Sequence, residues 1–318
     1  MKKIYCFFVL ISLLAILFSC SNETEKVLSP PERGQNPVVF KHNKQEFKIF
    51  NYYQEFQDYL NNAKEQPANL DELYKQSIHE ALRKNGFGYS QLSDWMFTTP
   101  TDLEATAESI DSLINKQNSI NNSIKEALIE SSELLPGENK TIHVLPAIPE
   151  FNAAIKEINY VGGFVWQKDS MLILIDPLFL EEDLKSTVAH EYHHTVYKET
   201  NPNVWYTLLE NSIVEGKADV FAEMIYPNTD VAWSEPLSDY DNEKVWKIFM
   251  ENLDSKDSTI IQGFINGNPY YGIPQWSSYK IGKQIMERFL EENPNLPIEE
   301  WTKMSESNIF SKSKYDLN

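Results

Sequence analysis

The sequence predicts an α+β protein that is mostly helical, with a small β-sheet in the middle of the chain. Helical patterns occupy long stretches before residue 136 and after residue 180, and short apolar runs bounded by turn residues lie between them. A hydrophobic content of 42% and an aromatic content of 13% are enough to build a packed core. A helical region, then a sheet, then further helices is an order typical of the α+β class.

The first 20 residues have the pattern of a lipoprotein signal peptide. A short basic start precedes an apolar run over 6–18, which is too short to span a bilayer permanently. The sequence Leu-Phe-Ser-Cys at 17–20 resembles a bacterial lipobox, although Phe18 is larger than the residue usual there. We therefore expect cleavage before Cys20, a lipid on its sulfur and an extracytoplasmic, membrane-anchored protein. An uncleaved anchor and a plain secretory signal are the alternatives.

The polar, proline-bearing sequence that follows lacks periodicity, so we expect a flexible tether over 21–45. Cys6 would leave with the signal peptide and Cys20 would carry the lipid, so no thiol is left for a disulfide or a metal site. A net charge of −19 repels nucleic acid and anionic lipid head groups, and neither is expected as a partner.

The region 46–138 is expected to be helical. One helical segment begins after Asn69 and closes at Gly86, a second opens at the capping box over 101–104, and a third runs over 120–135 up to a Pro-Gly pair. This part of the sequence contains no cluster of catalytic residue types.

The remaining region, 139–318, combines strands with longer helices. A strand is expected over 141–145, and a hairpin is expected from the apolar runs 161–166 and 171–176, which a polar turn separates. The longer helical patterns cover 182–198, 204–226, 243–253 and 276–292.

The first of these helices contains the pattern H-E-x-x-H. His190 and His194 lie at i and i+4, about 5–6 Å apart on one helix face, so their imidazoles can bind a single ion. Zinc suits them, because tetrahedral zinc takes nitrogen ligands at about 2.0–2.1 Å. Glu191 is placed to accept a proton from metal-bound water. The pattern is short, but half of the six histidines fall within 190–194.

Catalytic zinc sites generally use three protein ligands and one open position. Glu215 is the candidate third ligand, since the short turn at 201–203 folds its helix back against the first. Gly216 beside it permits close approach between helices. Asp219 lies one turn after Glu215 on the same face, and we expect it to accept a hydrogen bond from the ring of His190.

Four other residues are weaker candidates for the site. Glu210 has no aspartate four residues later, and Glu223 lies two turns beyond Glu215. His193 points off the face shared by the two candidate ligands, so a structural or substrate-facing role is expected for it. His143, on an expected strand, is interpreted as a core histidine.

The segments H-E-Y-H-H at 190–194 and E-G-K-A-D at 215–219 together resemble the gluzincin class of zinc peptidases. Within it they resemble a domain-of-unknown-function family described as Zn-dependent proteases. The likeness covers 141–313 and includes Ile-Asp-Pro at 175–177 and an aromatic segment over 270–282.

The resemblance implies a zincin-like catalytic domain over 139–318 that holds one zinc ion through His190, His194 and Glu215. Glu191 would then be the general base, and a peptide or protein would be the substrate. Tyr279 or Tyr271 is the candidate stabiliser of the oxyanion. As in zincins generally, the strand over 171–175 is expected to be the edge with which an extended peptide pairs.

These observations predict a membrane-tethered zinc metallopeptidase. The alternative is a zinc-binding lipoprotein that acts as a non-catalytic binding or chaperone-like module, although the intact Glu191 argues against it. A zinc amidase that acts on cell-wall peptides would share the same chemistry and differ only in its substrate.

Overall fold

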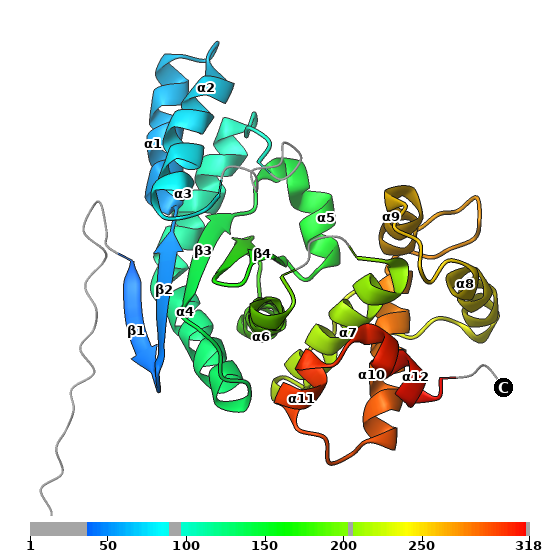
Figure 1. Cartoon of the computed structure of the whole chain (residues 1–318). Coiled ribbons are helices and arrows are strands. Elements are labelled where there is room, and N and C mark those ends of the chain that lie inside the picture. The colour runs from blue at the N-terminus through cyan, green and yellow to red at the C-terminus, as the bar shows by residue number, and fades with distance from the viewer. Residues whose placement is uncertain (1–36, 89–96, 203–205, 316–318) are drawn as a thin grey trace, which may run out of the picture. The chain divides into compact units, whose positions relative to one another are not determined.

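A five-stranded mixed sheet lies at the centre of the fold (Figure 1). The structure is a computed structural model and describes residues 37–88, 97–202 and 206–315. The strand order is β1-β2-β3-β5-β4; β3 runs parallel to both of its neighbours, and the two outer pairs are antiparallel. The strands are β1 Val38–His42, β2 Gln45–Asn51, β3 Lys140–Pro146, β4 Val161–Gln167 and β5 Ser170–Ile175. Helices precede and follow β3 to β5, so the predicted α+β class is confirmed.

The hairpin of β1 and β2 was not expected from the sequence. Phe47 and Ile49 of β2 are fully buried and Lys48 between them is exposed, which is the alternation of a strand with one face on the core. The prediction of a flexible tether is therefore wrong for residues 38–45, because β1 pairs with β2 along its whole length. The rest of the tether and the signal peptide, with Cys20, lie outside the described residues.

Among the described residues, four α-helices lie between β2 and β3 in the chain. They are α1 Tyr53–Glu65, α2 Leu70–Tyr74, α3 Glu80–Lys84 and α4 Leu103–Leu134, with a π-helical turn, Lys75–His79, between α2 and α3. The two helices expected from 101 and over 120–135 are one, because α4 continues for 32 residues without a glycine or proline to end it. Its cap is Asp102, whose Oδ1 accepts a hydrogen bond from the Ala105 N–H at 3.1 Å.

The hairpin of β4 and β5 forms as predicted, but β5 does not lie at the edge of the sheet. β5 lies between β3 and β4, and all six of its residues are buried. β4 is the edge strand on this side of the sheet, so the prediction of an edge over 171–175 is wrong. The cause is the parallel pairing of β5 with β3, for example Ile173 with Val144, which local alternation in the sequence does not reveal.

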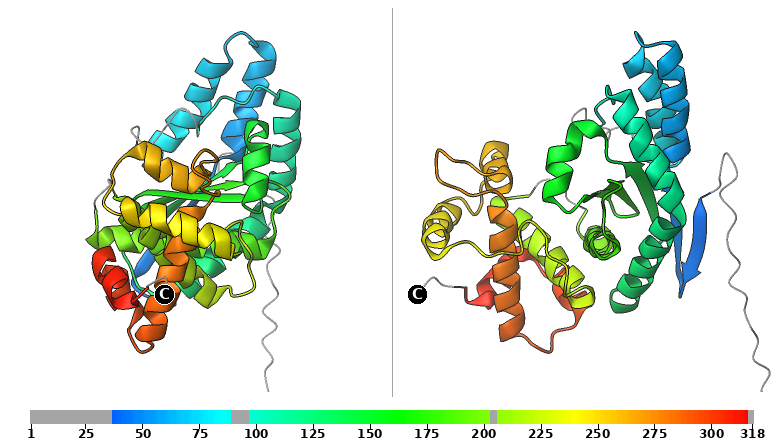
Figure 2. Two further views of the ribbon diagram at one scale, coloured as in Figure 1. Left: turned by 90° about the vertical axis from the view of Figure 1, so that its right-hand side faces the viewer. Right: turned by 180° about the vertical axis from the view of Figure 1, so that it is seen from behind.

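Further helices follow β3 in the chain. They are α5 Asn152–Glu157, which follows a 3-10 turn at Pro149–Phe151, α6 Glu181–Thr200, α7 Leu208–Ile225, α8 Asp239–Glu251, α9 Ser258–Asn266, α10 Ser277–Glu292, α11 Ile298–Lys303 and α12 Glu306–Ser313. Of these, α6 packs against β4 and β5. α7 and α10 lie side by side in both views of Figure 2. Gly216 and Gly282 permit this contact, since a Cβ on Gly282 would overlap the carbonyl oxygen of Ser212. The close approach expected at Gly216 is thus made with α10.

One hydrophobic core extends through the described residues on both sides of the boundary expected at 138/139. Phe56 of α1, Ile124 of α4, Ile173 of β5 and Phe221 of α7 belong to the same buried cluster. The sheet joins the two parts, because β2 from the first pairs with β3 from the second. No helix in the described ranges has the length and apolar character needed to cross a membrane.

Candidate active site

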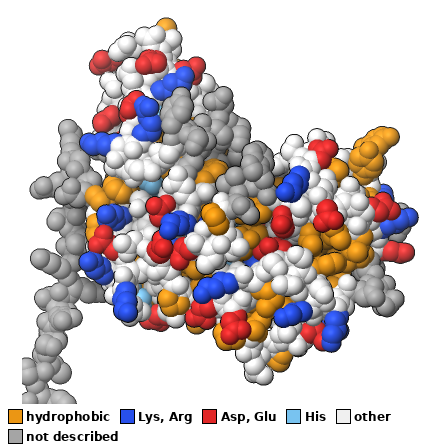
Figure 3. Space-filling model, viewed as in Figure 1, with side chains coloured by type: hydrophobic (Ala, Val, Ile, Leu, Met, Phe, Trp, Pro, Cys, Tyr) orange, Lys and Arg blue, Asp and Glu red, His pale blue; other side chains and the backbone are white. Residues whose placement is uncertain are grey.

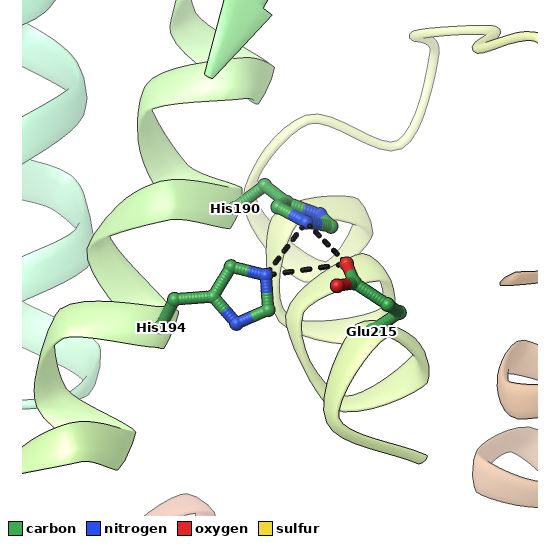
Figure 4. Close-up of side chains that lie close together, drawn as sticks. All are labelled: His190, His194 and Glu215. Atoms are coloured by element: carbon green, nitrogen blue, oxygen red, sulfur yellow. Dashed lines mark hydrogen bonds and ion pairs between the residues drawn. The ribbon is translucent and has the colours of Figure 1, made fainter. Parts of the chain in front are cut away.

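α6 and α7 bring two imidazoles and a carboxylate together (Figure 4). His190 and His194 lie one turn apart on α6, and their Nε2 atoms are 3.0 Å apart. Glu215 projects from α7, and its Oε2 lies 3.3 Å from each of these nitrogens. The structure thus places the three candidate ligands predicted from the sequence around one point.

The spacing and chemistry of these atoms fit a zinc ion. In a tetrahedral site with bonds of about 2.0–2.1 Å, neighbouring ligand atoms are about 3.3–3.4 Å apart. The observed separations of 3.0 to 3.3 Å are close to that value. Two imidazole nitrogens and a carboxylate oxygen are also ligands that zinc prefers. Acceptor lone pairs that converge on one point favour a positive charge there.

The electrostatics of the site favour that positive charge. Burial by itself lowers the pKa of His190, but the carboxylates of Asp219 and Glu215 outweigh it and the pKa is raised. Burial by itself raises the pKa of Glu215, but the imidazoles of His194 and His190 outweigh it and the pKa is lowered. Glu215 is therefore ionised and available as an anionic ligand.

Asp219 lies where the sequence predicts it, against the ring of His190. Its Oδ1 is 3.0 Å from His190 Nδ1, and its Oδ2 accepts a hydrogen bond from Trp233 Nε1 at 3.0 Å. A carboxylate at Nδ1 keeps the proton on that nitrogen and leaves the Nε2 lone pair free for a metal. Trp233 was missed, because it lies in the irregular segment between α7 and α8, where no periodic pattern marks it.

Glu191 lies in the same site but points to the sheet. Its side chain is 6% exposed and packs against β4, where a Cβ on Gly163 would overlap it. Burial raises the pKa of Glu191, and the two neighbouring imidazoles oppose the shift. Gly163 is a further site residue that was missed. The glycine pair at 162–163 was its signal, since glycine inside a strand often marks a close approach by another group.

A cavity of about 880 Å³ opens over these groups. Its lining comes from β4, from α6 and α7, from the loop around Trp233, and from α9 and α10. Tyr279 of α10 is part of it, and its ring packs against those of Trp233 at 4.7 Å and Trp276 at 5.3 Å. Burial raises the pKa of Tyr279 well above its ordinary value, and the nearby charge of Glu215 adds to the effect.

Tyr271 does not belong to the site, so the prediction of an oxyanion role for it is wrong. It lies in the turn closed by the bridge between Asn268 and Ile273, and it is 55% exposed. Its ring packs edge-on against Tyr270, which is also exposed, and it does not line the cavity. The turn directs both tyrosines to solvent.

The weaker candidates have other partners. Glu210 completes the capping box of α7 by accepting a hydrogen bond from the Thr207 N–H at 2.8 Å. Glu223 lines the cavity but pairs with Lys283 at 3.0 Å.

Neither of the other two histidine candidates reaches the three ligand atoms. His193 is fully buried on the opposite side of α6, with Nε2 3.3 Å from Thr302 Oγ1. His143 is a core residue with Nδ1 2.7 Å from the Tyr52 hydroxyl.

Comparison with known proteins agrees with this geometry. The family model described as predicted Zn-dependent protease matches residues 120–311, which is more than half of the chain. The match begins within α4 and includes β3 to β5 and both site helices, whereas β1, β2 and α1 to α3 precede it. Neither the curated proteins nor the solved structures yield a match. The chain belongs to the family of predicted Zn-dependent proteases, a domain family of unknown function.

Proposed function

We propose that this protein is a zinc metallopeptidase that uses Glu191 as its general base. One observation carries the proposal: the buried carboxylate of Glu191 lies in the same cavity as a three-ligand group that fits zinc. A site that only bound zinc for structure would need neither the cavity nor this carboxylate.

His190, His194 and Glu215 would hold the ion, and Asp219 would fix the tautomer of His190. Zinc, when bound, would act as a Lewis acid that lowers the pKa of water to about 7 and polarises the substrate carbonyl. Glu191 accepts the proton of the attacking water and passes it to the leaving amine; its raised pKa suits a group that must hold a proton briefly. Tyr279 faces the cavity and supplies a donor for the developing oxyanion.

The substrate binds along β4. This strand pairs with β5 on one side only among the described strands, and its residues from Val161 to Trp166 line the cavity. An extended peptide can add to such an edge through main-chain hydrogen bonds, which provide affinity without fixing the side chains. The scissile carbonyl would then lie near Glu191, whose side chain packs against Gly163 of the same strand.

We also propose that a lipid on Cys20 tethers the enzyme to a membrane outside the cytoplasm. The basic start, the short apolar run and the lipobox-like sequence support this location. The acidic net charge of −19, with basic side chains dispersed among acidic ones on the face shown in Figure 3, supports protein rather than nucleic-acid partners. Mass spectrometry of the purified N-terminus tests the lipid, and Cys20→Ser should abolish it.

The enzymatic proposal is tested by digesting a peptide library with zinc-loaded wild type and Glu191→Gln. We expect the variant to keep one zinc ion per chain, measured by elemental analysis, and to lose about 10²-fold or more in rate. Glu182→Gln is the matched control, because Glu182 is an exposed acid on the same helix. Equal behaviour of wild type and Glu191→Gln, with zinc bound, would overturn the enzymatic proposal and favour the binding module.

A further inference from the structure

Lys198 is a cation in the wall of the candidate active-site cavity. It lies on α6 one turn after His194, and both residues line the cavity. Its Nζ donates a hydrogen bond to the Tyr206 hydroxyl at 3.3 Å and lies 5.5 Å from the centre of that ring. Tyr206 lines the cavity as well. No carboxylate of the described residues lies within ion-pair distance of this ammonium group.

This lack of a counter-ion sets Lys198 apart from most lysines that are not exposed. Four others are paired: Lys140 with Glu199, Lys185 with Glu126, Lys217 with Glu306 and Lys283 with Glu223. Lys280, which has no ion pair either, does not line the cavity. The contrast with Lys283 is the most informative, because Lys283 lines the same cavity and already has its carboxylate.

The charge of Glu215 opposes part of the effect that burial has on the pKa of Lys198, but the two side chains are not paired. Glu215 directs its Oε2 to the two imidazoles, each at 3.3 Å, and forms no ion pair with the lysine. A half-buried ammonium group without a carboxylate is costly, and burial lowers the pKa of Lys198. An anion that enters the cavity would supply the missing partner.

The geometry limits where that anion would be on a substrate. The helix rise of about 1.5 Å per residue puts Lys198 about 6 Å along the axis from His194. An extended peptide advances about 3.3 Å per residue, so for a substrate that runs along α6 this offset corresponds to about two residues.

We propose that Lys198 and the Tyr206 hydroxyl bind a carboxylate of the substrate within about two residues of the scissile bond. The ammonium group donates to one carboxylate oxygen, and the tyrosine hydroxyl donates to the same group while accepting from Lys198. The inference rests on the proposed peptidase function and adds a substrate class to it: peptides with an acidic side chain, or with their free C-terminal carboxylate, at this position.

Matched octapeptides test the inference. One apolar sequence is made with a single Glu or Gln at each position in turn, and each peptide is made as the free acid and as the C-terminal amide. Cleavage by zinc-loaded wild type gives kcat/KM, and titration of zinc-loaded Glu191→Gln gives binding without turnover. We expect a preference of about tenfold for the carboxylate over the amide at one position, the size of one charge-assisted hydrogen bond.

Lys198→Met should remove this preference, and Lys198→Glu should reverse it in favour of a lysine-bearing peptide. Lys283→Met should leave the preference unchanged, since the charge of Lys283 is already matched. A Glu preference identifies a side-chain carboxylate, and a free-acid preference identifies the C-terminus. Cleavage without either preference, or a preference that persists in Lys198→Met, would overturn the inference and leave the peptidase function intact. A preference seen in binding without any cleavage would overturn the function instead, and absence of all peptide binding would overturn both.

Discussion

The two faces of the α6–α7 pair carry the same kinds of side chain and use them in opposite ways. On the cavity face, His190, His194 and Glu215 direct their polar atoms at one another across 3.0 to 3.3 Å. On the opposite face, His193 and Lys217 are fully buried. The residues of the two faces are close neighbours in the sequence and include the same residue types. Residue type alone therefore does not distinguish the two faces.

On the opposite face, the ammonium group of Lys217 is held by three polar contacts. Lys217 Nζ donates to the carbonyl oxygens of Thr302 at 3.3 Å and Met304 at 2.8 Å, and to Glu306 Oε1 at 2.8 Å. The Tyr197 hydroxyl donates to the same carboxylate oxygen at 2.9 Å. These bonds attach α11 and α12 to α7, and α12 to α6 as well. Each donor of Lys217 has an acceptor, whereas on the cavity face the acceptors converge and need a cation. Convergence of acceptors, rather than burial of charge, marks the functional face.

The largest effect is expected from a substitution on the opposite face of the α6–α7 pair. Lys217→Met should lower the free energy of unfolding by about 3–5 kcal/mol, because it leaves the buried Glu306 carboxylate without its partner. The measurement is urea denaturation of the zinc-loaded proteins. Glu306→Gln in the same background should recover part of the loss, since it removes the unpaired charge. If Lys217→Met instead lowered zinc content while stability stayed constant, the division between the two faces would be wrong.

The next largest effect is expected on zinc affinity, from a substitution on the cavity face. Asp219→Asn should weaken zinc binding about 10–100-fold, since the amide replaces the charged acceptor at His190 Nδ1. Competition with a chromophoric chelator measures the affinity. Urea denaturation of the metal-free protein should change much less than in Lys217→Met. An unchanged zinc affinity would show that His190 does not depend on this carboxylate.

A further buried histidine, His143, is expected to make the stability of the fold depend on pH. Burial lowers the pKa of His143 to about 3, below the value of about 6.5 expected in the unfolded chain. Below pH 6.5 the unfolded chain therefore binds a proton that the folded protein does not, and stability falls between pH 6.5 and 3. At pH 5 the loss relative to pH 7 is about 2 kcal/mol.

His143→Gln isolates this contribution. The variant should lose about 2 kcal/mol less than wild type between pH 7 and pH 5 in urea denaturation, because its side chain does not titrate. All other ionisable groups are common to the two proteins, so their contributions cancel in the difference. Equal pH dependence of stability in the two proteins would show that folding does not lower the pKa of His143.

The part of the site that follows helix periodicity could be predicted from the sequence. His190 and His194 share a face because they are four residues apart, and the same spacing aligns Glu215 with Asp219. The longer helices and the β4–β5 hairpin were predicted for the same reason: each is a local pattern with a period of its own.

What the sequence did not reveal depends on contacts between distant segments. The central place of β5 is set by parallel pairing with β3, and β1 and β2 join the sheet across a long insertion of helices. Tyr279 and Tyr271 look alike in the sequence, but one lies on the cavity side of α10 and the other in an exposed turn. Trp233 lies in a loop, where the direction of a side chain cannot be predicted from a repeating pattern in the sequence.

Trp233 provides the smallest expected effect and the sharpest test of how far the cavity face extends. Trp233→Phe keeps an aromatic ring against Tyr279 and removes the hydrogen bond from Nε1 to Asp219 Oδ2. Because one hydrogen bond to a charged group contributes about 1.5 kcal/mol, and part of that is regained from water, we expect zinc affinity to fall less than tenfold. If Trp233 acts through Asp219, the same substitution in Asp219→Asn should cause a smaller further loss, as a double-mutant cycle would show. Additive losses would mean that Trp233 shapes the cavity independently of the aspartate, and the polar network on this face would then end at Asp219.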